Sequence, residues 1–259
     1  LIDESVTIAT IHSYTRVDVT DPRFLLLQVR NPGDPMAAQE VRCFARSLPC
    51  TLSHIEVFDL LSGAPSTSAL KRTDVVLIGG SGEHSVVRGG PWLPRALDTM
   101  AELHAKSRAT FASCWGFQAM AQALGGTVIT DRNRAEVGTA WVELTHEGEA
   151  DPVFGPLGKR FRVPIGHEDV VTEIPKSARL LASSDLVKNQ AFVFMDKPIY
   201  ATQFHPELNR ADLVARLTKY REYLPLTGHK SIKEFEDNTP ETPESESILP
   251  RFLREVLGD

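Results

Sequence analysis

The amino-acid sequence predicts an α/β fold, in which an open and mostly parallel sheet carries helices on both faces. Three observations support this prediction. The chain of 259 residues is long enough for a sizeable core. Strand-like and helix-like segments alternate from residue 23 onwards. Strand-like runs such as 75–78 are continuously apolar, which is typical of parallel strands covered on both faces.

The elements expected in the first half of the chain follow this alternation. An apolar strand RFLLLQV (23–29) leads into a helix over about 35–48, and LSHIEVFDL forms the strand 52–60. Further along the chain come a strand TDVVLIGG, a helix, a strand ATFASC and a second helix, over 73–80, about 92–107, 109–114 and 115–124. In sheets of this kind, binding sites lie at the carboxyl ends of the strands.

The second half shows a different pattern. Short polar and apolar alternations between Thr127 and about Arg162 are typical of antiparallel hairpins added to a parallel sheet. The segment 190–204 is expected to form two strands joined by a turn at Asp196 to Pro198, and a last helix is expected over about 210–224.

Composition divides the chain into four predicted parts: an N-terminal extension at 1–22, the α/β domain at 23–225, an acidic Pro-rich linker at 226–247, and an amphipathic helix at 248–259. The stretch EDNTPETPESES (236–247) has no apolar residue, so we expect it to be mobile. The final helix has one apolar face, with Ser247 expected as its cap. This helix must dock on its own domain or on a partner.

Charge and cysteine content exclude several classes of protein. The net charge is −6 and the basic residues are scattered, so we expect no nucleic-acid partner. No apolar run approaches the roughly 18 residues of a membrane span, and no signal peptide is recognisable, which favours a cytoplasmic protein without membrane contact. The three cysteines form no CxxC pair, and the histidines show no metal-ligand spacing. We expect neither a metal nor a cofactor.

The segment SCWGFQAMAQALGG (113–126) contains the first candidate for catalysis. Cys114 lies between a predicted strand and a predicted helix, where a sharp turn exposes the side chain and the helix N-terminus favours a thiolate. Such an elbow needs small neighbours, which Ala112 and Gly116 provide. A cysteine buried as a small hydrophobic residue is the alternative.

The segment YATQFHPE (200–207) contains the second candidate. An apolar strand ends near His205 and Glu207, and residues two apart in an extended chain face the same side, so Glu207 can orient His205. Parallel strands that end at one sheet edge would bring this pair to Cys114. By itself the motif could equally be an exposed surface histidine at a turn.

The segment LIGGSGEHS (77–85) contains the third candidate. Gly79, Gly80 and Gly82 would let backbone amides approach a ligand closely, and Gly80 is well placed to supply an N–H to an oxyanion. A phosphate cradle or a plain turn is possible from the pattern alone. Neither GxxxxGK nor GxGxxG occurs, so phosphate binding is the weaker interpretation.

The motifs GGSGEHSV, ASCWGFQ, GHEDVV and QFHPE together resemble the class I, triad-type glutamine amidotransferase family, and within it the glutaminase domain of GMP synthetase. The resemblance covers roughly residues 23 to 222 in the family's order. It implies a flavodoxin-like architecture. It also implies hydrolysis of the glutamine side-chain amide through a γ-glutamyl thioester, with ammonia passed to a synthetase.

The resemblance also implies a role for individual residues. Cys114 matches the nucleophile, His205 the general base and acid, and Glu207 the residue that orients the imidazole. Backbone amides of the oxyanion hole match Gly80 and Trp115. Positions that hold the glutamine moiety match Gly80, Gly82 and Gln118. The loop GHEDVV makes Glu168 and Asp169 candidates for substrate contacts, although a solvated acidic turn is the simpler interpretation.

Three departures from the family pattern bear on substrate selectivity. The elbow begins with Ala112 where the family usually has Gly, Phe117 replaces a frequent His or Met, and Ser81 stands inside the glycine-rich loop. After Leu224 only the linker and a short helix remain, so we expect either that the ammonia acceptor belongs to a separate synthetase chain or that ammonia is released to water.

Three functions are therefore compatible with the sequence. The first is a free-standing glutaminase that acts on glutamine. The second is a γ-glutamyl hydrolase for a γ-glutamylated amine or peptide, which a differently lined mouth around Ser81 and Phe117 would favour. The third is a non-catalytic regulatory protein that docks to a synthetase through its C-terminal helix.

Overall fold

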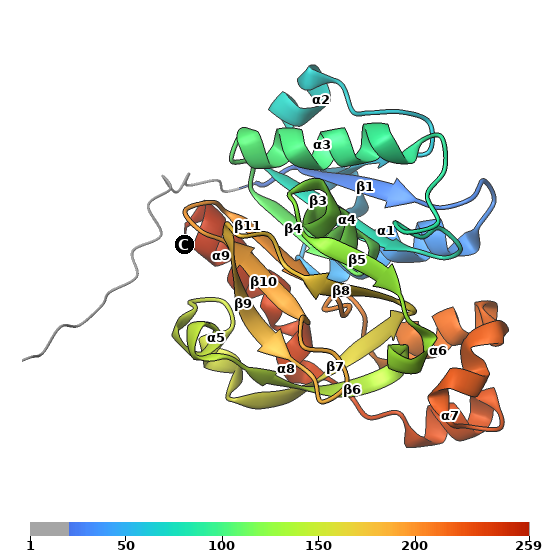
Figure 1. Ribbon diagram of the computed structural model, residues 1–259. Helices are drawn as coiled ribbons and strands as arrows, with labels where there is room; N and C mark the ends of the chain where they lie inside the picture. The colour runs from blue at the N-terminus through green and yellow to red at the C-terminus, as the bar shows by residue number, and fades with distance from the viewer. Residues whose placement is uncertain (1–20, 259) are drawn as a thin grey trace, which may run out of the picture.

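The computed structural model describes residues 21–258, and these form an α/β domain around a mixed sheet (Figure 1). Within this range the large sheet has nine strands in the order β2-β1-β3-β4-β11-β10-β9-β6-β7. The predicted fold class is confirmed. The predicted extension at 1–22 lies outside the described residues except for its last two positions.

The parallel half of the sheet consists of β2 (Ile55–Asp59), β1 (Phe24–Val29), β3 (Val75–Ser81), β4 (Thr110–Ser113) and β11 (Ile199–Thr202). These strands follow the predicted segments closely. Because neighbouring strands here are parallel, their carboxyl ends lie at one edge of the sheet.

The antiparallel half consists of β10 (Ala191–Phe194), β9 (Ala178–Ser183), β6 (Glu136–Leu144) and β7 (Arg160–His167). The turn expected between β10 and β11 is present. The strand β5 (Thr127–Thr130) does not join a hairpin with β6, and pairs instead with β8 (Asp169–Glu173) in a separate two-stranded sheet. Local alternation predicted the strand but could not identify its partner, because β8 is far away in the sequence.

Helices cover both faces of the sheet. The helices α2 (Thr67–Arg72), α3 (Leu93–Ala105) and α4 (Trp115–Ala123) pack on one face, and α1 (Pro35–Ser47) and α9 (Ile248–Leu257) pack on the other (Figure 1). Side chains of β1 alternate between the two faces of the sheet. Leu25 and Leu27 pack against the first group of helices, and Phe24 and Leu26 pack against the second. The short helix α5 (His146–Ala150) and three 3-10 turns (Leu52–His54, Arg132–Arg134, Gly155–Leu157) connect the strands.

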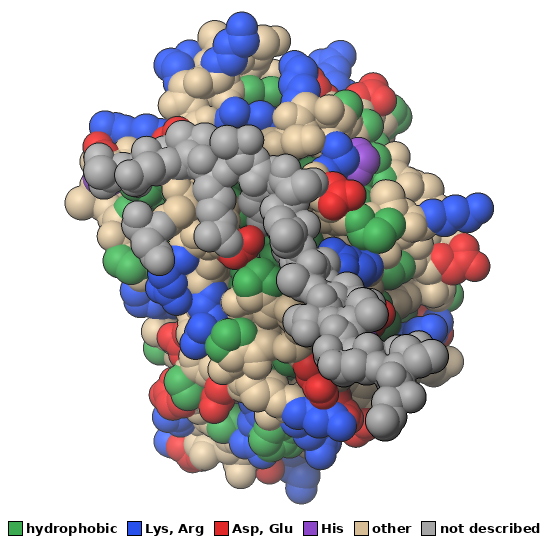
Figure 2. All heavy atoms as spheres, turned by 90° about the vertical axis from the view of Figure 1, so that its left-hand side faces the viewer, with side chains coloured by type: hydrophobic (Ala, Val, Ile, Leu, Met, Phe, Trp, Pro, Cys, Tyr) green, Lys and Arg blue, Asp and Glu red, His purple; other side chains and the backbone are tan. Residues whose placement is uncertain are grey.

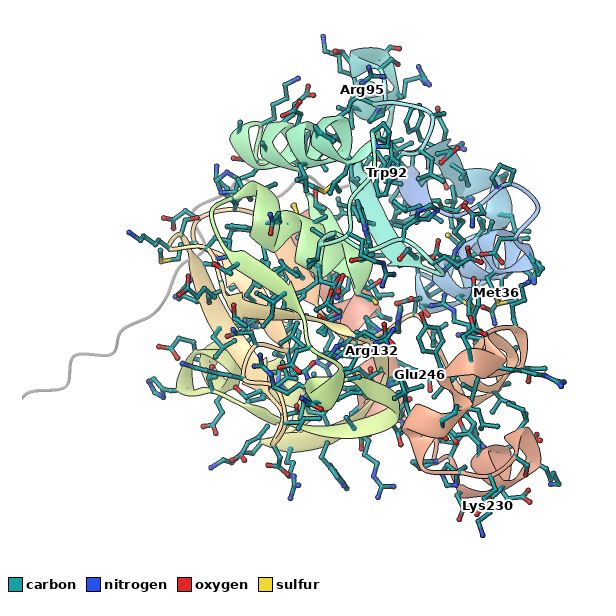
Figure 3. The ribbon with its side chains drawn as sticks, turned by 45° about the vertical axis from the view of Figure 1, so that its right-hand side comes forward. Met36, Trp92, Arg95, Arg132, Lys230 and Glu246 are labelled. Atoms are coloured by element: carbon teal, nitrogen blue, oxygen red, sulfur yellow. The ribbon has the colours of Figure 1, made fainter. Side chains whose placement is uncertain are left out.

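The segment 226–247 differs from the predicted mobile linker. After α6 (Arg210–Lys219) the chain continues through a 3-10 helix (Arg221–Thr227), α7 (Ile232–Asn238) and α8 (Pro243–Glu246). Phe235 on α7 is buried, and so are Thr239, Thr242 and Ser245, which lie within the polar stretch. The prediction of a mobile linker was wrong because small hydroxyl side chains can pack against a domain that offers them a complementary surface. Figure 3 shows these helices beside the sheet, with Lys230 at their outer end.

The last helix, α9, docks on its own domain. Its apolar face enters the core, where the ring of Phe252 lies 5.2 Å from Phe111 and 5.7 Å from Tyr200. Ser247 does not cap this helix as predicted. Its backbone is already helical, and its hydroxyl donates to the carbonyl of Glu244 in the preceding α8.

Acidic and basic side chains are intermixed over the described part of the face drawn in Figure 2. Over residues 21–258, none of the helices combines the length and the apolar character that a bilayer crossing requires.

Candidate active site

Cys114 lies in a strained turn between β4 and α4. Its backbone φ of 53° is in the left-handed region, which a residue with a Cβ rarely adopts. A Cβ on Gly116 would lie 2.8 Å from a side-chain carbon of Ile78 and 2.9 Å from its carbonyl oxygen, so only glycine lets the turn pack against β3. Ala112 is completely buried beneath the turn. The small neighbours that the elbow requires are therefore explained by packing.

The pairing of β4 with β11 brings His205 to Cys114. The two strands are parallel with Ser113 opposite Thr202, and the Cys114 amide donates to the Thr202 carbonyl at 2.8 Å. Beyond Thr202 the chain turns, and the His205 amide donates to the carbonyl of Pro164 at 2.9 Å. The imidazole thus reaches the thiol because two chain segments end at the same sheet edge, as the sequence predicts.

Gly80 lies between the thiol and the imidazole. A Cβ built on Gly80 would lie 3.6 Å from the Cβ of Cys114 and 3.6 Å from Nε2 of His205. Both groups therefore border the same small space. The thiol also donates to the carbonyl of Gly166 at 3.4 Å.

His205 forms a buried ion pair with Glu207. Its Nδ1 lies 2.7 Å from Oε1 of the carboxylate, and Glu207 is fully buried. Burial by itself lowers the pKa of His205, but the charges of Glu207 and Cys114 and hydrogen bonds to both side chains raise that pKa to about 9. Burial raises the pKa of Glu207, yet the charges of His205 and Arg216 keep it below its usual range. The raised pKa of His205 favours the charged imidazole, which suits a group that takes a proton from the thiol.

The pair does not lie in an extended strand as the sequence suggests. β11 ends at Thr202, and residues 203–207 follow it as a turn, in which the Leu208 amide donates to the His205 carbonyl at 3.1 Å. The side chains of His205 and Glu207 still face each other, because the turn reverses the chain between them.

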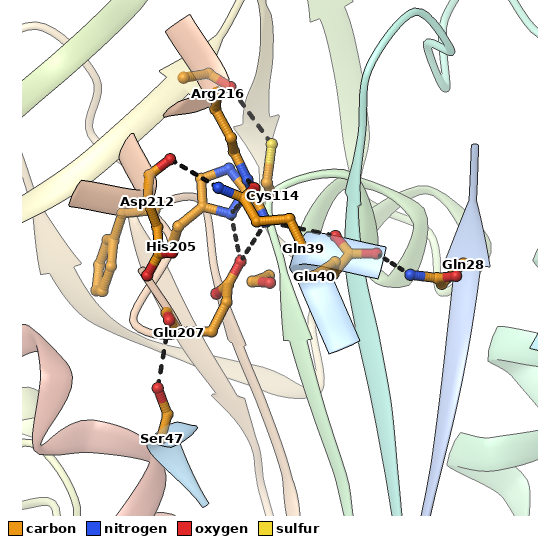
Figure 4. Close-up of polar contacts among 12 residues, drawn as sticks. Gln28, Gln39, Glu40, Ser47, Cys114, His205, Glu207, Asp212 and Arg216 are labelled. Carbon is orange, nitrogen blue, oxygen red and sulfur yellow. Dashed lines mark hydrogen bonds and ion pairs between the residues drawn. The ribbon is translucent and has the colours of Figure 1, made fainter. Parts of the chain in front are cut away.

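Arg216 on α6 is a site residue that sequence reasoning missed. Its Nη2 lies 3.7 Å from the carboxylates of both Glu207 and Glu40, and its Nη1 lies 3.2 Å from Nδ1 of His205 (Figure 4). Arg30, the residue after β1, binds Glu40 from the other side at 2.9 Å. Four buried charges thus connect Glu207 to α1 and to the carboxyl end of β1. The sequence signal for this residue was an arginine among the apolar residues that form one face of the predicted helix, next to Leu217.

A cavity opens in front of the thiol. The space there measures about 920 Å³ with the open solvent at its mouth included, and its lining includes Cys114, His205, Trp115 and Gln118. The amide nitrogen of Gln118 donates to the Asp169 carbonyl at 3.0 Å and to the Gln203 side chain at 3.1 Å, which fixes its orientation.

The glycine-rich loop borders the same cavity. Gly82 is a lining residue, and a Cβ there would collide with the Tyr220 hydroxyl. Glu40 occupies the space in which Gly79 would carry a Cβ. Gly79, near the end of β3, and Gly82, in the loop after it, are therefore both required by the close approach of other side chains.

The loop GHEDVV also lines the cavity. The Asp169 carboxylate is buried and accepts hydrogen bonds from Ser85 and Thr130, both at 2.5 Å, so it is not part of a solvated turn. Glu168 is partly exposed and lies 3.5 Å from Arg132. Both residues line the cavity. Each carboxylate oxygen of Asp169 already accepts a hydrogen bond from a hydroxyl group of the protein.

Phe117 does not line the mouth, contrary to the expectation from the sequence. Its ring is buried on the opposite side of α4, 4.9 Å from the ring of Phe192. Ser81 does line the cavity, and its hydroxyl donates to the His84 carbonyl at 2.5 Å. Among residues 21–258, no group of three or more His, Cys, Asp or Glu side chains is placed to hold a metal ion.

A Gly80→Ala substitution is expected to lower strongly the rate of a reaction that uses Cys114 and His205, while the fold is kept. The new Cβ would lie 2.8 Å from Cε1 of His205, so the ring must move away from the thiol. A displacement of about 1 Å can cost roughly 100-fold in rate. Steady-state kinetics would measure the effect, with circular dichroism to verify folding. Wild-type turnover would contradict the placement of the ring.

Comparisons with known proteins identify the family of this chain. The family model described as Glutamine amidotransferase class-I matches residues 45–216. A subunit of the GMP synthase [glutamine-hydrolyzing] of Methanothermobacter thermautotrophicus is 28% identical over 186 residues, which cover 72% of this chain and 90% of the relative. The GMP synthase [glutamine-hydrolyzing] of Thermus thermophilus is 31% identical over 215 residues, covering 82% of this chain and 38% of the relative. The chain thus spans well under half the length of that second relative.

A solved structure shows the same fold. The crystal structure of a glutamine amidotransferase from Thermotoga maritima superposes with a TM-score of 0.72 at 21% identity, covering 92% of this chain and 99% of that chain. Because the family model matches more than half of the chain, this protein belongs to the class I glutamine amidotransferase family.

Proposed function

We propose that this chain hydrolyses the side-chain amide of glutamine through a γ-glutamyl thioester on Cys114. One observation carries the proposal. A thiol, an imidazole and a carboxylate from two distant segments meet at one end of a cavity, and the thiol lies at a strained strand-to-helix turn. The names of the relatives, which are glutamine-hydrolysing GMP synthases, support the same reaction.

The first half of the reaction forms the thioester. His205 holds the proton of the Cys114 thiol, and the thiolate attacks the amide carbon. Backbone N–H groups of Gly80 and Trp115 stabilise the oxyanion. When the carbon–nitrogen bond breaks, His205 returns the proton to the nitrogen, and ammonia leaves.

In the second half, His205 takes a proton from water, the hydroxide attacks the thioester carbonyl, and glutamate leaves as the thiolate re-forms. Glu207 stays ionised throughout and stabilises the charged imidazole. Gly82 and Gln118 hold the glutamyl moiety, and Glu168 contributes a negative charge to the cavity lining. The backbone carbonyl of Asp169 positions Gln118 by accepting a hydrogen bond from its side-chain amide.

We further propose that the ammonia acceptor is bound by a separate synthetase chain. One relative is named as a single subunit of a GMP synthase, and this name supports the assignment.

Covalent capture tests the proposed function. A glutamine analogue that carries an electrophilic diazoketone should add its γ-glutamyl-like group to one cysteine, identified by mass spectrometry of the digested chain. We expect the adduct on Cys114 in wild type and in Cys50→Ala, and none in Cys114→Ala. Cys50 is a suitable control because it is a partly exposed free cysteine. An adduct on Cys50, or none in wild type, would contradict the proposal.

A further inference from the structure

One side of the cavity is apolar and lies against His205. The apolar wall, as we call it, consists of six residues that belong to one hydrophobic cluster or pack against it: Val137, Leu208, Leu213, Leu217, Tyr223 and Phe235. The polar side chains named above, such as Gln118 and Glu168, form another part of the lining.

The apolar wall lines the same cavity as the imidazole. The backbone amide of Leu208 donates to the His205 carbonyl at 3.1 Å, and both residues line the cavity. Leu213, Arg216 and Leu217 are three and four residues apart, so they share one face of α6. Arg216 lies 3.2 Å from Nδ1 of His205, and its two leucine neighbours line the same cavity as the imidazole.

The opposite end of the apolar wall reaches the thiol. Val137 on β6 is paired with Gly166 on β7, and the Gly166 carbonyl accepts a hydrogen bond from the Cys114 thiol. A Cβ on Gly166 would meet no atom within 4 Å, so this end of the wall borders open space. Phe235 closes the wall by packing on Gly138, where a Cβ would lie 3.1 Å from its ring.

The leaving nitrogen must face this wall. In the proposed reaction His205 protonates the nitrogen as the amide bond breaks, so that nitrogen and whatever it carries point toward the imidazole. Ammonia is small and polar and gains nothing from leucine and phenylalanine side chains. An alkyl or aryl substituent on the nitrogen would bury its surface against them.

The residues after 216 contribute half of the wall, namely Leu217, Tyr223 and Phe235, and they lie beyond the segment that the family model matches. This part of the chain therefore adds an apolar surface to the reaction space of the matched domain.

We infer that the apolar wall is a subsite for the leaving group, and that this chain hydrolyses γ-glutamyl amides whose nitrogen carries an apolar substituent. The inference rests on the proposed function, because it uses the same thioester. Thiolate attack breaks the carbon–nitrogen bond, His205 protonates the departing amine in place of ammonia, and water then releases glutamate.

A homologous series of substrates tests the inference. Glutamine and its N-methyl, N-ethyl and N-butyl γ-amides all release glutamate, which one coupled assay measures for every member. Burial of one methylene contributes about 0.8 kcal/mol, which corresponds to about fourfold in kcat/KM. We therefore expect kcat/KM to rise with chain length, by at least tenfold from the methylamide to the butylamide.

A variant pair locates the effect. In Phe235→Asn the ratio of kcat/KM for butylamide over methylamide should fall several-fold, whereas Phe235→Leu should keep most of it. The ratio is independent of the fraction of folded enzyme, since both substrates are measured on one preparation. Val137→Thr, which is close to isosteric, should lower the same ratio if the Phe235 variants do not fold.

The outcomes separate the two claims. Hydrolysis of glutamine together with a flat or falling alkylamide series would overturn the leaving-group subsite and leave the proposed function intact. A rising series that none of the wall variants alters would also overturn it. No glutamate from any substrate, together with no adduct on Cys114, would overturn the proposed function and this inference with it.

Discussion

A Glu207→Gln variant is expected to lose about four orders of magnitude in kcat, because the carboxylate that orients and charges the imidazole is replaced by a neutral amide. The carboxylate is fully buried and lies 2.7 Å from Nδ1 of His205. Without its charge, only the charge of Cys114 and the hydrogen bond to it oppose the effect of burial, so the pKa of His205 should fall from about 9 toward its ordinary value. Kinetics and an NMR titration of the imidazole would measure both effects.

The stabilisation that the His205–Glu207 ion pair gives to the fold is expected to depend on pH. The folded-state pKa of His205 lies above its ordinary value of 6.5, so the stabilisation is fully present below pH 6.5 and is lost as the pH rises through about 9. The difference in unfolding free energy between wild type and Glu207→Gln should therefore shrink between pH 6.5 and 10. Urea denaturation across this range would measure it.

The matched control for Glu207→Gln is Glu56→Gln, a carboxylate at the opposite edge of the sheet that is 45% exposed. It should change neither kcat nor the pH profile. If Glu207→Gln behaved like this control, the ion pair would have no role in the reaction.

Arg216→Met should destabilise the fold by about 3 kcal/mol at pH 7. Methionine fills similar space but removes the positive charge between two buried carboxylates, those of Glu207 and Glu40. Glu40 retains Arg30 as an ion-pair partner, so most of the lost stabilisation should come from Glu207. The pKa of Glu207 should rise, since the charge of Arg216 contributes to keeping it low. Chemical denaturation would measure the loss of stability.

Two further variants distinguish buried from exposed charge. Arg72→Met removes an exposed pair with Glu56, which is worth at most about 1 kcal/mol, and serves as the control. Arg216→Lys keeps the charge and should recover part of the loss. A change below about 1 kcal/mol in Arg216→Met would mean that the carboxylates are stabilised without this arginine.

Most of the central sheet could be predicted from local patterns. The strands β1 and β3 are almost continuously apolar, because both of their faces are covered by helices. The elbow could also be anticipated, since a turn that tight leaves room only for small residues such as Gly116. The candidate site residues Cys114 and His205 could be anticipated because each lies shortly after an apolar strand, Cys114 directly after β4 and His205 three residues after β11.

Other features depended on contacts between distant segments. The polar stretch 236–247 was predicted to be mobile, yet Thr242 and Ser245 are buried because the domain surface accommodates them. Phe117 follows the elbow in sequence, but the direction of its side chain on α4 takes it into the core instead of the mouth.

The sequence by itself predicted the layered fold and the cysteine turn, because both depend on local packing and backbone preference, and its resemblance to a known family pointed to the three candidate catalytic side chains. The tertiary structure alone decided that Arg216 lies between Glu207 and Glu40, and that the helices after α6 form an apolar wall beside the imidazole. The physical reason is that charge pairing and cavity shape depend on distances between residues far apart in the chain, and no local pattern encodes those distances.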